Sequence, residues 1–259
     1  MDQEAVVMKK IMVVIPTYNE IENLPLIVDA LFKLPVENVH ILIVDDNSPD
    51  GTGMLADELA AKQYAGRLQV IHRTEKSGLG PAYIAGFKHA IRSSADYVIQ
   101  MDADFSHQPK YIPDLLKAIE TKDMVLGSRF AKGGSVDETW SFYRKLLSWF
   151  ANRIYTPAIL GIPVYDATGG FRIWRRQTLI GLDLDRVRSN GYVFQVEMAY
   201  ITHRLGFRVA EIPIHFPDRK LGTSKMDIRI QLEAALRVWQ VMRRHHALNP
   251  EMRRTEVYT

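Results

Sequence analysis

Short apolar runs alternate with amphipathic segments through the first half of the chain. Five of these runs, rich in β-branched residues, predict buried strands at residues 11–15, 39–44, 68–71, 97–101 and 124–126. Apolar positions three and four residues apart predict helices at residues 20–32, 52–64, 81–91 and 111–120. Repeated strand–helix units indicate an α/β fold with a mostly parallel sheet flanked by helices.

Polar clusters follow three of the predicted strands. PTYNE follows the first strand, DDNSPDG the second and DAD the fourth. Ligands bind α/β sheets beyond the carboxyl ends of the parallel strands. The sequence therefore predicts that a binding site is assembled from these three segments.

Beyond Phe130 a Gly-rich loop at residues 132–135 leads to two amphipathic helices. The first predicted helix has an apolar face made of Trp140, Tyr143, Leu147, Phe150 and Ile154. The second has an apolar face made of Ile228, Leu232, Ala235, Trp239 and Met242. Its opposite side carries Arg229, Glu233, Arg237, Gln240 and Arg244. Such helices are typical of a membrane surface, although the same pattern fits a helix packed on its own core.

These patterns suggest one structural unit with two parts. Residues 1–225 are expected to form the catalytic domain, and residues 226–259 an amphipathic helix with a polar tail belonging to the same unit. The last ten residues are polar and charged, and we expect them to fray.

Composition excludes several classes of protein. The 259 residues include 33 basic and 30 acidic ones, a balance that does not favour nucleic acid as a partner. The absence of cysteine excludes disulfides, thiolate metal sites and a cysteine nucleophile, and fits a cytoplasmic location. No stretch approaches the ~20 apolar residues of a membrane-spanning helix, so any membrane contact is expected to be peripheral.

Asp102 and Asp104 are the sharpest chemical feature. Two carboxylates one residue apart, just past a buried strand, can share a hard divalent cation such as Mg²⁺ or Mn²⁺. In a sugar transfer from a diphosphate, that cation neutralises the leaving group. The alternative is that Asp102 caps a turn and Asp104 is merely solvated.

The two earlier clusters suggest nucleotide binding. Asp46 can accept hydrogen bonds from a base or ribose, whereas its neighbours have the chemistry of a turn and a helix N-cap. Tyr18 can stack on a base and Glu20 can bond it, although Asn19 can equally cap the next helix. Neither G-x-G-x-x-G after the first strand nor a P-loop sequence occurs, which disfavours the competing nucleotide folds.

Together these segments resemble family 2 glycosyltransferases of the GT-A fold. SGLGPAYIAGF, DADFSHQP, GSRF, TGGFR, NGYVFQVEM and DRKLGTSKM extend the match. This series is similar to the dolichol-phosphate and bacterial polyprenol-phosphate mannose synthases, from about residue 11 to residue 242.

The resemblance implies a role for each matching position. It implies nucleotide contacts by Pro16, Tyr18, Glu20, Val44 and Asp46, and diphosphate and metal contacts by Asp102, Ala103 and Asp104. Arg129 would lie beside the diphosphate and the acceptor phosphate, and Arg219 and Lys225 would clamp the donor from a mobile loop. Some relatives carry a Gln as an extra metal ligand where this chain has Ser106, so water, His107 or Gln108 would complete the coordination.

The implied reaction is transfer of mannose from GDP-mannose to a polyprenyl or dolichyl phosphate, with inversion. That phosphate is already an anionic nucleophile, so positive charge matters more than a general base. Asp104, Arg129 and Arg144 are therefore the candidate catalytic residues, with Lys145 as a further cation. Glu197 is a candidate for orienting a substrate or for a structural role.

Three alternatives remain open. The enzyme could use UDP-glucose or another UDP-sugar with the same lipid phosphate. A non-catalytic recruiting subunit has no need of the carboxylates and cations together, and a sugar-nucleotide pyrophosphorylase normally has a Gly-rich signature after its first strand. We expect a peripheral protein on the cytoplasmic face of the membrane, with or without a separate anchoring partner.

Overall fold

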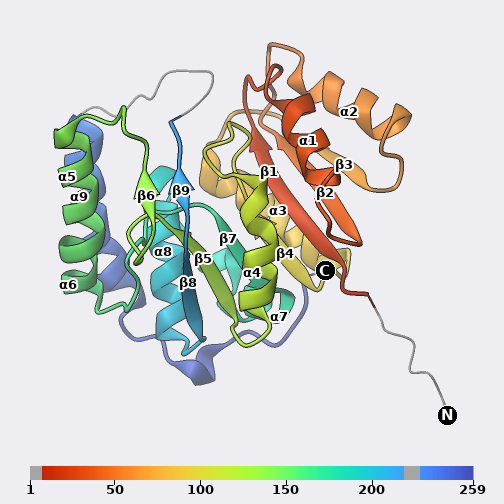
Figure 1. The fold of residues 1–259 in the computed structure, drawn as a ribbon. Helices are drawn as coiled ribbons and strands as arrows, with labels where there is room; N and C mark the ends of the chain where they lie inside the picture. Colours follow the sequence, from red (N-terminus) through yellow and green to blue (C-terminus); the bar gives the residue numbers. More distant parts are fainter. Residues whose placement is uncertain (1–7, 219–227, 259) are drawn as a thin grey trace.

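The computed structural model of the chain describes residues 8–218 and 228–258. A seven-stranded sheet has the strand order β3-β2-β1-β4-β7-β5-β8 (Figure 1). Its strands are β1 (Ile11–Thr17), β2 (Val39–Asp45), β3 (Leu68–His72), β4 (Tyr97–Gln100), β5 (Met124–Ser128), β7 (Arg172–Arg175) and β8 (Val209–Pro213). Neighbouring strands pair in parallel except at β7, which is antiparallel to both β4 and β5. The predicted α/β fold with a mostly parallel sheet is therefore confirmed.

Helices cover both faces of this sheet and bury a core on each (Figure 1). One face is covered by α1 (Leu24–Phe32), α2 (Thr52–Lys62) and α4 (Ile112–Ile119). The other is covered by α3 (Leu79–Arg92), α7 (Arg176–Leu182) and α8 (Gly191–Arg204). Short 3₁₀ turns are η1 (Pro109–Tyr111), η3 (Leu184–Arg186) and η4 (Pro250–Met252).

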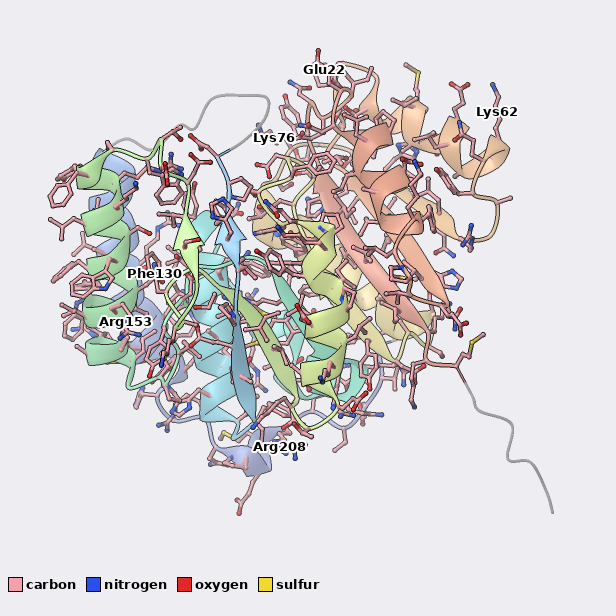
Figure 2. All side chains as sticks on the ribbon, viewed as in Figure 1. Glu22, Lys62, Lys76, Phe130, Arg153 and Arg208 are labelled. Atoms are coloured by element: carbon pink, nitrogen blue, oxygen red, sulfur yellow. The ribbon has the colours of Figure 1, made fainter. Side chains whose placement is uncertain are left out.

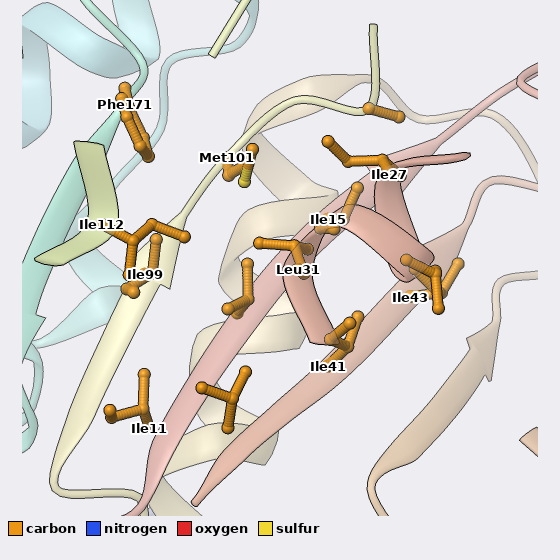
Figure 3. Packing of buried hydrophobic residues seen from close by; sticks show 14 of the residues in the cluster. Ile11, Ile15, Ile27, Leu31, Ile41, Ile43, Ile99, Met101, Ile112 and Phe171 are labelled. Atoms are coloured by element: carbon orange, nitrogen blue, oxygen red, sulfur yellow. The ribbon is translucent and has the colours of Figure 1, made fainter. Parts of the chain in front are cut away.

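β1 shows how a continuous apolar run supplies both cores. Because successive side chains of a strand point to opposite faces, Ile11, Val13 and Ile15 enter the first core and Met12 and Val14 the second. Figure 3 shows the first core, where isoleucines of β1 and β2 meet α1. A strand buried on both faces needs this unbroken apolar pattern, which is why it was recognisable in the sequence.

Three elements, α1, β7 and β8, differ from the expectation. The helix expected at residues 20–32 begins at Leu24, because the chain first makes a turn after Asn19. Asn19 has a φ of +59° and does not cap the helix; its N–H donates to Ser48 Oγ at 3.1 Å. β7 and β8 were not predicted, since β7 is four residues long with arginine at both ends.

The first amphipathic helix runs from residue 142 to residue 160, whereas residues 140–154 were expected. It consists of α5 (Phe142–Phe150), a π-helical turn η2 (Ala151–Tyr155) and α6 (Thr156–Leu160). None of the residues of α5 is buried. Trp140 lies before the helix and is only 6% exposed, with its ring edge against Phe216. Trp140 is therefore not part of the apolar face, and the prediction that placed it there was wrong.

The strand segment beside this helix is a small separate ribbon. β6 (Ser135–Val136) follows the Gly-rich loop and pairs in parallel with β9 (His215–Phe216). This ribbon places Phe216 against Trp140 and so holds the start of α5 near the sheet.

α9 (Ile228–His245) packs against α8 and α6. From residue 235 onward its buried residues include Val238, Val241 and His245, whereas Leu236 and Trp239 are exposed. The side of α9 that packs on α8 runs through Val238, and Trp239 of the predicted apolar face stays exposed, so the core does not cover that face at Trp239. Within the described part of the chain, no helix is long and apolar enough to cross a membrane.

The expectation that the last ten residues fray was wrong. Tyr258 is 6% exposed, and its hydroxyl accepts a hydrogen bond from the backbone N–H of Leu184. Arg254 Nη1 donates to Asp183 Oδ1 at 3.0 Å. A single aromatic anchor with a flanking cation thus holds the polar tail on η3.

Candidate active site

The carboxyl ends of β1 and β2 are joined by side-chain hydrogen bonds. Thr17 lies opposite Asp45 in the strand register, and its hydroxyl donates to Asp45 Oδ1 at 2.9 Å. Asp45 also accepts bonds from the hydroxyl and the backbone N–H of Ser48. Asp45 and Ser48 therefore shape the edge of the sheet, in agreement with the structural role expected for this segment.

Tyr18 and Glu20 both have partners within the protein. Lys76 Nζ lies 3.6 Å from the centroid of the Tyr18 ring, a cation–π contact (Lys76 is labelled in Figure 2). Glu20 Oε2 accepts a hydrogen bond from Asn23 Nδ2 at 2.7 Å. Stacking of Tyr18 on a base remains a prediction, with Lys76 as a neighbouring cation that the sequence did not reveal.

Three of the other nucleotide-site residues differ in accessibility. Pro16 is half-buried at the end of β1, opposite Val44. The side chains of Val44 and Ala103 are buried in the two cores. Burial limits any contact of Val44 or Ala103 with a nucleotide to the main chain.

Asp46 is held between the second strand and the loop before α3. Arg73 Nη1 donates to Asp46 Oδ1 at 2.6 Å, and the N–H of Gly78 donates to Asp46 Oδ2 at 3.2 Å. The Asp46 side chain is only 6% exposed. The Asp46 carboxylate is thus held at the sheet edge by Arg73 and by the N–H of Gly78. The sequence analysis did not predict either of these hydrogen-bond partners.

Asp102 and Asp104 lie in the turn that follows β4. Tyr83 donates its hydroxyl to Asp102 Oδ1 at 2.8 Å, and the N–H of Ser106 donates to Asp104 Oδ1 at 3.0 Å. Burial raises the pKa of Tyr83 well above its ordinary value, and the charge of Asp102 raises it further, so the phenol stays a donor. The backbone of Phe105 has a φ of +62°, a left-handed conformation that is uncommon for an aromatic residue.

This donor set fits Mg²⁺ or Mn²⁺. A carboxylate has about four acceptor positions, so the bond from Tyr83 to Asp102 Oδ1 leaves positions on that carboxylate for a metal. Such ions often bind one or two protein carboxylates and complete their shell with water and substrate phosphate. Within residues 8–218 and 228–258 no group of three or more His, Cys, Asp or Glu could hold a metal. The two aspartates therefore suit a cation that arrives with a diphosphate.

His107 is engaged in packing. Its Nδ1 accepts a hydrogen bond from the N–H of Asp102 at 2.9 Å, and its ring stacks on Phe171 at 5.2 Å. It is 2% exposed. These contacts make His107 a support for the turn, whereas Gln108 lines a surface hollow together with Phe105 and Pro217.

Arg129 is clamped by a buried carboxylate. Its Nε donates to Asp166 Oδ2 at 2.8 Å and its Nη2 to Asp166 Oδ1 at 2.6 Å. Nη2 also donates to Thr168 Oγ1 at 2.8 Å. Burial alone would lower the pKa of the guanidinium, but the charge of Asp166 raises it, so Arg129 is a fixed cation.

The turn that carries Asp166 and Thr168 is itself held by hydrogen bonds from the buried Arg172. Arg172 is fully buried, and it donates to the carbonyl oxygens of Ala167 and Gly169, each at 2.9 Å. Burial lowers the pKa of Arg172 to about 10. Asp166 was missed in the sequence, although it directly precedes the ATGGFR segment, where an acid could have been considered as a partner for the arginine of GSRF.

Arg144 and Lys145 begin α5. The Arg144 guanidinium lies 3.6 Å from the centroid of the Trp140 ring, and its Nη1 is 3.5 Å from Asp218 Oδ1. Lys145 Nζ donates to the carbonyl oxygen of Glu138 at 3.1 Å. Arg144 is therefore oriented by an aromatic ring, which suits a cation that meets an anionic ligand.

Glu197 has a structural role. It is 0% exposed; one carboxylate oxygen accepts bonds from Arg244 and His245 of α9, each at 2.7 Å. The other accepts from the N–H groups of Arg188 and Ser189. Burial alone would raise the pKa of Glu197, but these bonds, from His245 above all, lower it to about 2. Glu197 thus ties α8 both to α9 and to residues 188–189, which precede α8.

Arg219 and Lys225 lie outside the described residues. Their role in clamping the donor therefore stays a prediction. The described site otherwise has its carboxylates after β2 and β4, and its cations at Arg129 and Arg144.

The chain belongs to the family 2 glycosyltransferases, as the resemblance in its motifs indicated. The model of that family, Glycosyl transferase family 2, matches residues 12–182. The chain is 45% identical over 245 residues to an undecaprenyl-phosphate mannosyltransferase of Micrococcus luteus, covering 94% of this chain and 99% of that protein. It is 47% identical over 219 residues to a polyprenol monophosphomannose synthase of Mycolicibacterium smegmatis, covering 84% and 81% of the two chains.

Solved structures support the fold. Glucosyl-3-phosphoglycerate synthase from Mycobacterium tuberculosis, in complex with Mn²⁺, UDP and phosphoglyceric acid, matches with a TM-score of 0.65. The match covers 91% of this chain and 78% of that chain at 18% identity. The same enzyme with UDP alone matches with a TM-score of 0.63, also at 18% identity, covering 91% and 80%. At this identity the likeness establishes the GT-A type of fold and nothing finer.

Proposed function

We propose that the protein transfers mannose from GDP-mannose to a polyprenyl or dolichyl phosphate at a membrane surface. The observation that carries this proposal is the 45% identity to an undecaprenyl-phosphate mannosyltransferase over 94% of the chain. The alignment spans 99% of that relative, so the similarity extends over nearly its whole length. The product would be a β-linked mannosyl lipid phosphate together with GDP.

Asp102 and Asp104 would hold the divalent cation, Mg²⁺ or Mn²⁺. When bound, that cation neutralises the charge that develops on the leaving diphosphate. Tyr83 and the N–H of Ser106 orient the two carboxylates beforehand. Asp46, with Tyr18 and Glu20, would meet the nucleotide at the neighbouring strand ends.

Arg129 would bind the acceptor phosphate. A lipid phosphate needs no base to remove a proton, so the protein has to place it and offset its charge. The bonds from Arg129 to Asp166 and Thr168 fix the guanidinium before any ligand binds. Arg144 is a second cation on α5 for the same anion.

The test is lipid-linked sugar formation by the purified protein. Polyprenyl phosphate would be incubated with GDP-mannose or UDP-glucose, with Mn²⁺, with Mg²⁺ or with EDTA. We expect transfer from GDP-mannose that requires metal and falls at least about 100-fold in Asp104→Asn. Transfer from UDP-glucose alone would keep the reaction class and replace the donor. Absence of transfer from either donor would refute the proposal.

The lipid acceptor requires contact with a membrane, and α5 is suited to make it. Its exposed apolar residues are Phe142, Tyr143, Leu146, Trp149 and Phe150, and we call them the α5 face. Phe142 is 80% exposed. Trp239 and Leu236 of α9 are also exposed, and α9 packs against α6, which continues α5 through η2. Exposed aromatic and aliphatic residues on a helix are suited to the interfacial region of a bilayer.

Co-sedimentation with lipid vesicles tests this peripheral location, which we place at the cytoplasmic face of the membrane. Trp149→Glu should weaken vesicle binding by about tenfold or more, because it puts a charge into the buried apolar contact. Leu26→Glu is the matched control, an exposed leucine on α1 at the other side of the molecule. If Trp149→Glu and Leu26→Glu bind vesicles equally well, the α5 face is not the membrane contact. If the unaltered protein does not bind vesicles, a separate anchoring partner is indicated.

A further inference from the structure

A π-helical turn interrupts the helix that carries the α5 face. The turn η2 joins α5 to α6, so that residues 142–160 form one continuous helical segment. Turns of this kind are rare and occur frequently at functional sites. Asn152 lies in the turn and is 1% exposed, whereas Ile154 is 44% exposed. The helix thus turns a polar side chain inward directly after its exposed apolar face.

Asn152 uses both ends of its side-chain amide. Its Nδ2 donates to the carbonyl oxygen of Ser148 at 3.0 Å and to Thr168 Oγ1 at 2.9 Å. Its Oδ1 accepts from the N–H of Thr168 at 3.0 Å. These bonds hold both the main chain and the hydroxyl of Thr168.

Thr168 connects this asparagine to Arg129. A hydroxyl has two acceptor positions, and on Thr168 one donor is Asn152 Nδ2 and the other is Arg129 Nη2, at 2.8 Å. Asp166 holds the same guanidinium through Nε and Nη2. Removal of the Thr168 hydroxyl would therefore free one side of the guanidinium while leaving the ion pair intact.

A second contact joins the same two regions. Arg153, the next residue of the π-helical turn, places Nη1 3.5 Å from the carbonyl oxygen of Phe130, the residue after Arg129 (both are labelled in Figure 2). The π-helical turn thus contacts the Arg129 segment in two ways, through the Phe130 carbonyl oxygen and through Thr168.

We propose that Asn152 is a positioning residue that acts through Thr168 to orient Arg129 toward the acceptor phosphate. Because Asn152 and the α5 face belong to one continuous helix, the arginine has a fixed place relative to the surface that meets the lipid. The polyprenyl phosphate headgroup then finds its cation at a set position from the membrane. This inference rests on the proposed function.

Steady-state kinetics with both substrates test this role. Thr168→Val removes the hydroxyl at nearly constant volume, and it should raise the KM for polyprenyl phosphate about tenfold, the effect of one lost charge-assisted hydrogen bond. Thr168→Ser keeps the hydroxyl and should restore the KM of the unaltered protein. Asn152→Ala should give a similar rise, and the double variant Asn152→Ala, Thr168→Val should add little to either single change. The KM for GDP-mannose should stay within about twofold throughout.

Thr202→Val is the matched structural control. Thr202 is a buried threonine of α8 whose hydroxyl donates to the carbonyl oxygen of Met198, away from Arg129. It should lower the melting temperature with no change in either KM. If Thr168→Val behaves in the same way, the role is structural and the proposal is refuted; if Asn152→Ala does not fold, the two Thr168 variants decide. Absence of transfer by the unaltered protein would instead refute the proposed function, and this inference with it.

Discussion

Asp166→Asn tests the electrostatic design of the site. Asp166 is 0% exposed and accepts three hydrogen bonds from Arg129, from its N–H, its Nε and its Nη2. Asparagine has almost the same shape, so the substitution leaves the packing intact and removes the negative charge. It also replaces one acceptor oxygen by an NH₂ group that faces a donor. The Arg129 side chain is only 10% exposed and would keep its charge without its partner.

The expected loss of stability is large. Removal of one partner of a buried ion pair costs about 3–5 kcal/mol, mainly because the remaining charge stays desolvated. For a protein of this size each kcal/mol lowers the melting temperature by about 2–4 °C, so we expect a fall of about 6–20 °C. Within the about 5–15 kcal/mol that is typical of native proteins, any total stability above about 7 kcal/mol would leave the variant folded at room temperature.

Calorimetry and urea unfolding would measure this change. The matched control is Glu58→Gln on α2, which breaks an ion pair with Lys62 at 2.7 Å on the exposed surface. The control should melt with the unaltered protein, because water already screens that pair. A melting temperature of Asp166→Asn equal to that of the control would refute the reasoning, since it would mean that Arg129 is not desolvated by its surroundings.

Three further predictions concern stability. The folded-state pKa of Glu197 is about 2, below its ordinary value of 4.5, so the carboxylate stabilises the fold above pH 4.5. That contribution, on the order of 3 kcal/mol, is lost as the pH falls toward 2. The stability of Glu197→Gln, followed by acid unfolding, should lack this dependence on pH. Tyr258→Phe should lower the urea-unfolding free energy by about 1–3 kcal/mol, because the N–H of Leu184 loses its acceptor. Gly86→Ala should destabilise by about 1–3 kcal/mol in the same assay, despite the better helix propensity of alanine, since the new methyl would lie 2.3 Å from Val14 Cγ1.

The sheet and the location of its ligand edge were predictable from local patterns. Strands buried on both faces need near-continuous apolar runs, and the polar clusters follow the ends of the runs in β1, β2 and β4. The apolar runs therefore predict that the segments after β1, β2 and β4 lie at the same edge of the sheet, and the parallel pairing of these strands confirms it. Asp102 and Asp104, the pair proposed to hold the metal, are close in sequence and could be recognised from the same kind of local pattern.

The partners of Arg129 were not predictable in this way. Asp166 and Thr168 lie 37 and 39 residues away along the chain, and Asn152 is 16 residues from Thr168. They meet only because β7 is inserted antiparallel between β4 and β5 and brings the turn before it to the end of β5. A four-residue strand with arginine at both ends carries little periodicity, so no local pattern predicts this insertion.

The amphipathic helices likewise separate what a sequence pattern predicts from what only the tertiary structure decides. Helical periodicity identified two amphipathic helices, although Trp140 lies outside the first of them, and the sequence contains no long apolar span. Periodicity does not say what covers an apolar side, because the core, a membrane and solvent are not distinguished by the spacing alone. The tertiary structure decided that Trp140 packs on Phe216, that Val238 of α9 faces α8, and that the α5 face stays exposed. The sequence thus determined the sheet and placed the carboxylates after β2 and β4, whereas the partners of Arg129 came from long-range packing that no local pattern encodes.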